Sequence, residues 1–384
     1  MLELVGAVQL PVRDLAALRS RIPAGAPIGA IRPDGSFWVH DLVNHTYAAV
    51  PVELRLATAH ADWLVEAGHA SGDVAAAADL FEQQTLPEVL RLTGTTWRPG
   101  ESGQPRMVIF NGRLSGAGGY MSVGDLQPRD VFPYSNEQPT VYINADGLRP
   151  GSSGYNLTLA HEFEHLVHAY VNPGQQGWLD EGLADLISRL VTGASSSAPR
   201  LFRSQPDVQL DAWSEQPWEA AAHYEASYLW ARYLMEQGGG PEALPSLIGS
   251  GASGLETIDR YAHLIGRQDG AAGLVVDWLV ANMSDPAAAG AGQFGYRGLN
   301  PGVAPTAVLS ADEPYDGSVH QFAGAYLELP AEAGRLLVRA EPTVPLVPAT
   351  EVRGAIYWSL RGDNVDTRLT RRFDLSGVSS ATRI

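Results

Sequence analysis

Hydrophobic and polar positions follow two different patterns along this chain, and the change comes after residue 144. Before that point, short apolar and β-branched runs bounded by turn residues predict strands. These runs are residues 46–57, 107–111 and 140–144. Residues 74–92 are the exception in this half, because their apolar positions recur at helical spacing and predict a helix.

Helical spacing dominates the following part of the chain. It predicts helices at residues 155–170, 178–191, 218–237, 253–265 and 271–283. The alanine- and glycine-rich stretch 286–292 ends this pattern and predicts a domain boundary. Beyond it, short runs separated by turn residues are typical of an all-β module, with strands expected at residues 322–329, 335–340 and 355–360.

The patterns therefore predict an α+β protein with three parts. Residues 1–40, with a short helical pattern at 12–22, are interpreted as a leader or the remnant of a propeptide. Residues 41–290 form the main domain, an α/β lobe followed by a helical lobe. Residues 300–384 form a β-rich C-terminal module.

Composition narrows the function. The 384 residues are 45% hydrophobic and 8% aromatic, which indicates a globular protein of two or three domains. Lys and Arg number 26 against 43 Asp and Glu, a net charge of −17. That charge disfavours nucleic acid and anionic membrane surfaces as partners. It leaves the oligomeric state open.

Two features that the sequence lacks narrow the possible functions further. The chain has no Cys, so any metal must bind through His, Asp or Glu. It has no run of 18 apolar residues, so we expect no membrane insertion. The first residues lack the basic and apolar regions of a signal peptide.

The segment His161-Glu162-Phe163-Glu164-His165 carries the chemistry. Residues four apart on a helix share a face, so both imidazoles reach a single Zn²⁺. Glu162 lies beside them, placed to take a proton from water that zinc has acidified. The pattern predicts a metal-assisted hydrolase.

A third metal ligand is expected on the next helix, where Asp180 and Glu181 follow 15 and 16 residues after His165. Either acid completes a His₂-carboxylate site. His168 shares the helix face of His161, but it lies a turn too far from the metal and is interpreted as a polar residue at the helix end.

At these residues the sequence resembles the gluzincin metallopeptidases, in which the HExxH helix is followed by a helix with Glu before Gly. The resemblance implies a zincin-like fold with Glu181 as the third zinc ligand and Asp185 orienting His161. It also implies that Tyr224, or else His223, stabilises the oxyanion of the reaction. The metzincin pattern HExxHxxGxxH is excluded, since its Gly position is His168 and its last His position is Val171. Tyr228 and Trp230 are expected in the core.

The glycine-rich residues 116–122 are predicted to form an edge strand. In zincins such a strand pairs with the extended substrate, which implies substrate contacts at Gly118, Gly119 and Tyr120. Aminopeptidase relatives carry an acid in this strand to bind the free amine. Residues 116–122 have none, which favours an endopeptidase.

Residues from about 40 to 240 also resemble bacterial secreted peptidases related to immune inhibitor A. The segments Asn111-Gly112-Arg113-Leu114 and Tyr142-Ile143-Asn144 share in this resemblance. It implies that the protein is secreted and that a C-terminal β-sandwich begins at residues 357–364. Too few residues follow for a whole sandwich, so the resemblance leads us to expect either a truncated chain or last strands that pack on the catalytic domain. Ca²⁺ could bind Asp363, Asn364 and Asp366, although a solvated turn is the commoner outcome.

The sequence thus predicts a zinc endopeptidase acting on protein or peptide substrates. His161, His165 and Glu181 bind zinc, Glu162 is the general base and Tyr224 stabilises the oxyanion. Two other hypotheses stay open. One is an inactive zincin fold that binds peptides or serves as a scaffold; the other is a zinc hydrolase of non-peptide amides.

Overall fold

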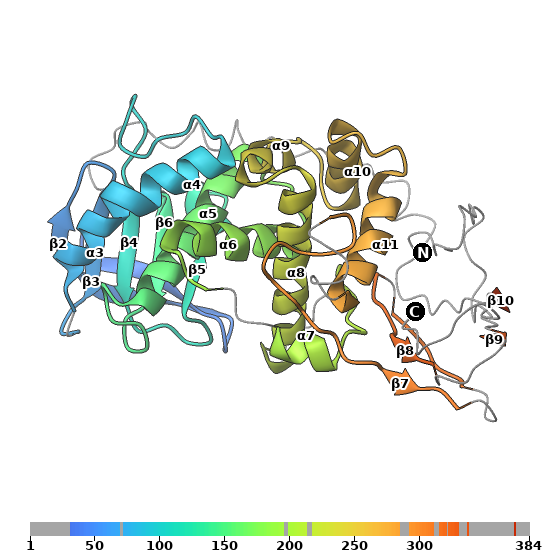
Figure 1. The fold of residues 1–384 in the computed structure, drawn as a ribbon. Helices are drawn as coiled ribbons and strands as arrows, with labels where there is room; N and C mark the ends of the chain where they lie inside the picture. The colour runs from blue at the N-terminus through green and yellow to red at the C-terminus, as the bar shows by residue number, and fades with distance from the viewer. Residues whose placement is uncertain are drawn as a thin grey trace, which may run out of the picture. The chain divides into compact units, whose positions relative to one another are not determined.

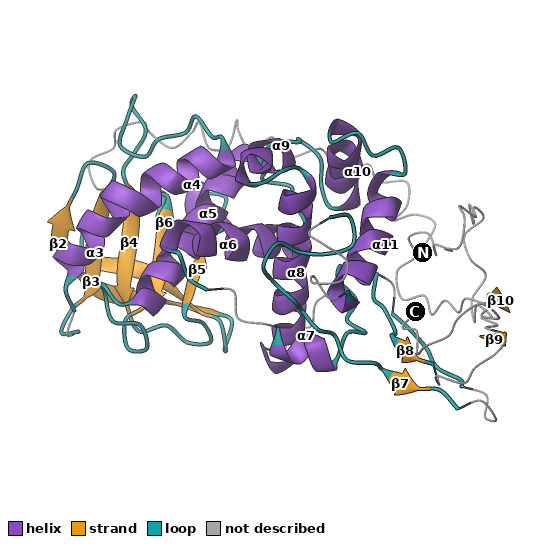
Figure 2. Ribbon diagram, viewed as in Figure 1, coloured by secondary structure: helices purple, strands orange, loops and turns teal. Residues whose placement is uncertain are grey.

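A computed structural model of the protein describes most of the chain. It covers residues 31–69, 72–195, 199–212, 217–284, 292–310, 315–320 and 322–329, with residues 217–219, 336–337 and 372–373 described by their backbone only. The protein is α+β, as the sequence predicts (Figures 1 and 2). It divides into two compact units. The first unit comprises the described residues up to Leu90 together with Thr96–Tyr170. The second comprises Arg91–Thr95 and the described residues from Val171 onward.

A six-stranded mixed sheet forms the centre of the first unit. Its strands lie in the order β1-β2-β3-β4-β6-β5. β3, β4 and β6 run parallel, while β1, β2 and β5 pair antiparallel with their neighbours. The strands are β1 Ser36–Asp41, β2 Thr46–Ala57, β3 Ala61–Glu66, β4 Met107–Gly112, β5 Gly119–Met121 and β6 Thr140–Asn144.

The predicted strands at 46–57, 107–111 and 140–144 are confirmed as β2, β4 and β6. β4 is buried at every position, as expected of a central parallel strand covered on both faces. β1 and β3 were not predicted. In β3 the polar Asp62 interrupts the apolar run, but the strand buries it beside the guanidinium of Arg106, 2.7 Å away.

The helix predicted over residues 74–92 exists, but it is interrupted. It consists of α3 Val74–Leu80, the π-helical turn η1 Phe81–Thr85 and α4 Leu86–Thr93. Pro87 explains the interruption, since its nitrogen has no hydrogen to donate to the carbonyl group one turn earlier. A π-turn is one way for a helix to absorb such a missing bond.

The two faces of the sheet have separate cores. On one face Trp63 of β3 contacts Phe81, whose ring lies 5.1 Å from that of Phe163 on the helix α5 Ser153–Val171. On the opposite face Phe37 stacks on Phe110, beside Tyr142. Residue Phe37 lies within the segment 1–40 of the sequence and is fully buried.

The second unit is mainly helical, and the helices predicted at 178–191, 218–237, 253–265 and 271–283 are confirmed within two residues at each end. The short helices α7 and α9 were not predicted. The elements are α6 Gly177–Thr192, α7 Arg200–Ser204, α8 Pro217–Gln237, η3 Pro241–Ala243, α9 Leu244–Ile248, α10 Leu255–Leu264 and α11 Gly270–Met283.

Aromatic side chains pack the core of this unit. Trp230 of α8 is fully buried and meets Trp278 of α11 edge-on, with ring centroids 5.3 Å apart. Trp278 also stacks on Phe202 of α7. Tyr228 is 6% exposed. The expectation that Tyr228 and Trp230 are core residues is therefore confirmed.

The C-terminal region contains four two-residue strands among the residues described, which are β7 Ala307–Val308, β8 Leu327–Glu328, β9 Leu336–Leu337 and β10 Arg372–Phe373. β7 pairs with β8 and β9 with β10. The strand expected at 322–329 is therefore reduced to the two residues of β8. β9 lies within the strand expected at 335–340, whose other residues lie outside the described ones. The helix at 12–22, the strand at 355–360 and the calcium candidates Asp363, Asn364 and Asp366 lie outside the described residues. None of the described helices has the length and apolar character needed to cross a membrane.

Candidate metal centre

The helix α5 is attached firmly to the sheet. The hydroxyl of Ser152 accepts a hydrogen bond from the Tyr155 amide at 3.3 Å, which caps the first turn. The Tyr155 hydroxyl donates to Asn111 Oδ1 of β4 at 2.6 Å. Burial raises the pKa of Tyr155, so this hydroxyl stays protonated and remains a donor. Both contacts orient the helix that carries the HExxH sequence.

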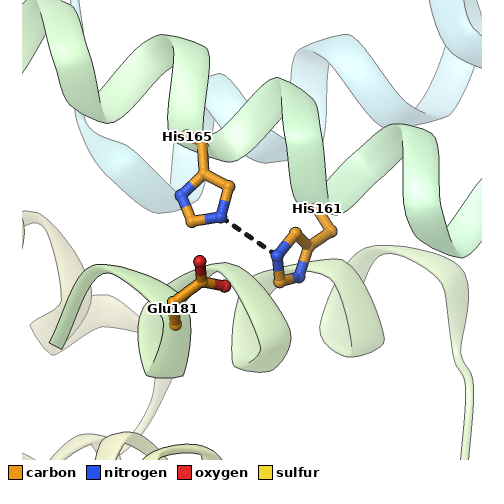
Figure 3. A group of neighbouring side chains, drawn as sticks. All are labelled: His161, His165 and Glu181. Carbon is orange, nitrogen blue, oxygen red and sulfur yellow. Dashed lines mark hydrogen bonds between the residues drawn. The ribbon is translucent and has the colours of Figure 1, made fainter. Parts of the chain in front are cut away.

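His161 and His165 lie one turn apart on α5 and turn their rings towards each other. Their Nε2 atoms are 3.0 Å apart, with one ring nitrogen donating to the other (Figure 3). His165 is 8% exposed and His161 is half-buried. The two imidazole nitrogens therefore lie next to each other, where the buried core meets the solvent-exposed surface.

Glu181 completes a group with these two imidazoles. It lies in the first two turns of α6, and its carboxylate points towards the two rings (Figure 3). One ligand atom from each of the three residues lies within 4.8 Å of the other two. Glu181 is half-buried. The three residues that the sequence selected as metal ligands are therefore brought together.

This donor set fits a zinc ion. Zinc bonds to imidazole nitrogen and carboxylate oxygen are about 2.1 Å long, so tetrahedral ligand atoms are about 3.4 Å apart. The Nε2 separation of 3.0 Å is close to that value, and the third ligand atom is within 4.8 Å. Two imidazoles and one carboxylate are the ligands of many catalytic zinc sites, which leave a fourth position open.

A second group shares His165. Glu164 and Asp180 each place a carboxylate oxygen within 4.8 Å of a His165 ring nitrogen. Glu164 is fully buried, which closes this side to solvent and substrate. Carboxylates beside a ligand histidine usually accept a hydrogen bond from its other nitrogen. Sequence reasoning gave such a role only to Asp185. It named Asp180 only as an alternative metal ligand, and it gave Glu164 no role.

Asp185 lies one turn after Glu181 on α6 and is half-buried. Its predicted contact with His161 stays a prediction. His168 lies in the last turn of α5, as the sequence suggested, but it is buried rather than exposed there. It is 1% exposed, and its Nδ1 lies 3.5 Å from the Glu164 carboxylate. His168 belongs to neither of the two ligand groups found among the described residues.

The edge strand β5 passes close to Glu162. A Cβ atom on Gly119 would lie 3.0 Å from Cγ of Glu162 and 2.7 Å from Cγ2 of Thr158. Glycine is thus required here because side chains of α5 lie against this face of the strand. Gly118 is less crowded, with Leu148 Cδ1 at 3.4 Å. β5 is the outermost strand of the sheet, as predicted.

Tyr120 points to the opposite face of the sheet from Gly119, as alternation along a strand requires. Its ring stacks on Tyr142 at 4.2 Å, and its hydroxyl accepts a hydrogen bond from the His40 amide. The Tyr142 hydroxyl donates to Asp125 Oδ2 at 2.5 Å. Burial raises the pKa of Asp125 to about 7. The Tyr120 side chain therefore anchors β5 to the sheet and does not lie on the face that meets α5.

Gly182 marks a close crossing of α6 and α8. A Cβ atom there would lie 2.4 Å from the Ser227 carbonyl oxygen. This explains the glycine that follows Glu181 in the sequence. Tyr224 lies one turn before Ser227 on α8 and is 39% exposed, while its neighbour His223 is half-buried. The carboxylate of Glu225 accepts two amide hydrogens of α7, which ties this turn of α8 to that helix.

Comparison with known proteins adds no assignment: the chain matches no family model and no curated protein.

Proposed function

We propose that the protein is a zinc-dependent endopeptidase. The observation that carries the proposal is the convergence of His161, His165 and Glu181, whose ligand atoms lie within 4.8 Å of one another. A histidine pair and a carboxylate are the ligands of gluzincin-type catalytic zinc. The same three residues are the ones that the resemblance to gluzincin peptidases selects.

In this proposal His161, His165 and Glu181 hold the metal. When bound, zinc supplies a Lewis acid that lowers the pKa of water and polarises a substrate carbonyl. Glu162 accepts the proton that the attacking water releases and passes it to the leaving nitrogen as the C–N bond breaks.

Tyr224 and Asp185 have supporting roles in the proposal. The Tyr224 hydroxyl donates a hydrogen bond to the oxyanion that develops on the attacked carbonyl. Two features support this role: its exposed side chain, and its place one turn from the crossing beside Glu181. Asp185 accepts a hydrogen bond from the second ring nitrogen of His161 and orients that ring.

The proposed substrate is an extended peptide that pairs with the backbone of β5. β5 is the last strand of the sheet and pairs with none of the described strands on its outer edge, which is the edge where an added strand would pair. Residues 116–122 contain no acid that would bind a free α-amine. This favours cleavage within a chain over removal of its first residue.

Replacing Glu162 by Gln tests the mechanism most directly. We expect the variant to keep one zinc per chain, measured by plasma mass spectrometry, because the ligands are unchanged. We expect its cleavage of fluorescent casein to fall by about 10²–10⁴-fold, the usual effect of losing a general base. Wild-type cleavage should stop with 1,10-phenanthroline and return with zinc.

The matched control is Glu53→Gln, which removes one exposed carboxylate from β2 and should leave cleavage unchanged. Undiminished cleavage by Glu162→Gln would refute the proposed base. A wild type that holds zinc, binds peptides and cleaves none would favour the inactive peptide-binding alternative. A folded wild type without zinc would contradict the metal centre.

A further inference from the structure

A cavity of about 160 Å³ lies within the second unit, next to α6 and α8. The proposed hydrolysis makes no use of it. Leu186, Leu190 and Met235 contribute apolar walls. Leu190 is 39% exposed and marks the opening to solvent, whereas Leu186 and Met235 are buried. The cavity is about as large as engineered cavities of ~150 Å³ that hold one benzene molecule.

One of the two arginines that line the cavity already has its partners. Arg232 Nε donates to Glu236 at 2.9 Å, and its two terminal nitrogens donate to the Tyr228 hydroxyl and the Arg297 carbonyl oxygen. Glu236 also accepts from the Arg297 amide at 2.7 Å. The Arg232–Glu236 pair is therefore a neutral, rigid part of the cavity wall.

Arg189 is the second arginine. Among the described residues that line the cavity, the only carboxylate is that of Glu236, which is already bonded. Its guanidinium lies over the Tyr228 ring at 5.0 Å. Its Nε is buried without a hydrogen-bond partner among the described residues. One terminal nitrogen makes a long bond of 3.4 Å to the Ser195 carbonyl oxygen. A buried donor of this kind is costly unless an acceptor reaches it.

We propose that this cavity binds a short aliphatic carboxylate, with Arg189 as its charged partner. A guanidinium presents two parallel donors that match a carboxylate. With Arg232 and Glu236 neutralising each other, Arg189 gives the cavity a net positive charge. The apolar walls accommodate an alkyl stem of two or three carbons, the size of a glutamate side chain or of butyrate.

The site is separate from the metal group and does not depend on the proposed function. Arg189 lies eight residues after Glu181 on α6, about 12 Å along the helix axis. Carboxylates also bind zinc, so the test must exclude that route. Titrations are therefore made on the wild type and again on Glu181→Ala.

The experiment is calorimetric titration of the full chain with butyrate and with N-acetyl-glutamate methylamide. The neutral N-acetyl-glutamine methylamide is the ligand control. We expect a carboxylate to bind wild type and Glu181→Ala alike, and the neutral amide not to bind. Arg189→Leu should weaken binding at least about tenfold, as loss of a charge-assisted pair of hydrogen bonds predicts. Arg200→Leu, which removes an exposed arginine outside the cavity, should not.

The outcomes are distinct. Binding of butyrate alone supports the site and identifies a free acid as its ligand, while binding of the blocked glutamate identifies an acidic side chain of a peptide. Thermal melting shows whether Arg189→Leu is folded, and Arg189→Gln repeats the test with a polar side chain. Equal affinity of wild type and both Arg189 variants would overturn the proposal, and so would binding that Glu181→Ala abolishes.

Discussion

The two ends of α6 present opposite charges to two different sites. Near its N-terminus, Asp180 and Glu181 lie beside the histidines of α5. Near its C-terminus, Arg189 lines a cavity with Tyr228 and Arg232 of α8. The first end collects donors for a cation, and the second end has the guanidinium that an anion needs.

Both charges are also the ones that the helix itself favours. Helix dipoles stabilise acids at the N-terminus and bases at the C-terminus by about 0.3–1 kcal/mol each. An acid or arginine at a helix end is therefore no sign of function by itself. What distinguishes the two ends is the second element, because only its side chains complete a ligand set or enclose a cavity.

The largest expected effect comes from removing Glu181. Glu181→Ala leaves two imidazoles, and two ligands hold zinc far more weakly than three. We expect zinc to be lost on dialysis while carboxylate binding at Arg189 is retained, as mass spectrometry and calorimetry would show. If a folded Glu181→Ala variant lost both zinc binding and carboxylate binding, the two ends of α6 would not be independent.

Gly182→Ala tests the close contact of α6 with α8, which lies between the two ends of α6. The added methyl group would lie 2.4 Å from the Ser227 carbonyl oxygen, so α8 must shift. We expect a free energy of unfolding lower by about 1–3 kcal/mol and weaker binding at both ends. Gly174→Ala is the control, since a Cβ there meets nothing within 4 Å. Unchanged thermal melting of Gly182→Ala would show that this contact is not tight.

Asp180→Asn gives the smallest effect and sharpens the account of the N-terminal end. If Asp180 supports His165 and is not itself a ligand, zinc affinity should fall by only about 10–100-fold, which competition with a chelator would measure. Loss of zinc as complete as in Glu181→Ala would instead make Asp180 a ligand.

Local sequence predicted a large part of this protein. His161 and His165 meet because four residues make one helical turn, which needs no knowledge of the rest of the chain. The strands at 46–57, 107–111 and 140–144 and the long helices follow from apolar spacing in the same way. The π-helical turn before Pro87 and the strand β3, in which the polar Asp62 interrupts the apolar run, were not predicted. Neither follows a simple apolar period.

The sequence by itself determined the ligand types, the elements that carry them and the helical spacing of the histidines, because these depend on contacts within a few residues. Tertiary structure alone decided that Glu164 and Asp180 gather at His165, that Gly119 lies against Glu162, and that Arg189 and Arg232 share a cavity. These groups come from segments far apart in the chain or from faces that only packing orients. Burial and the desolvation that accompanies it are properties of the packed fold, and no periodicity in the sequence encodes them.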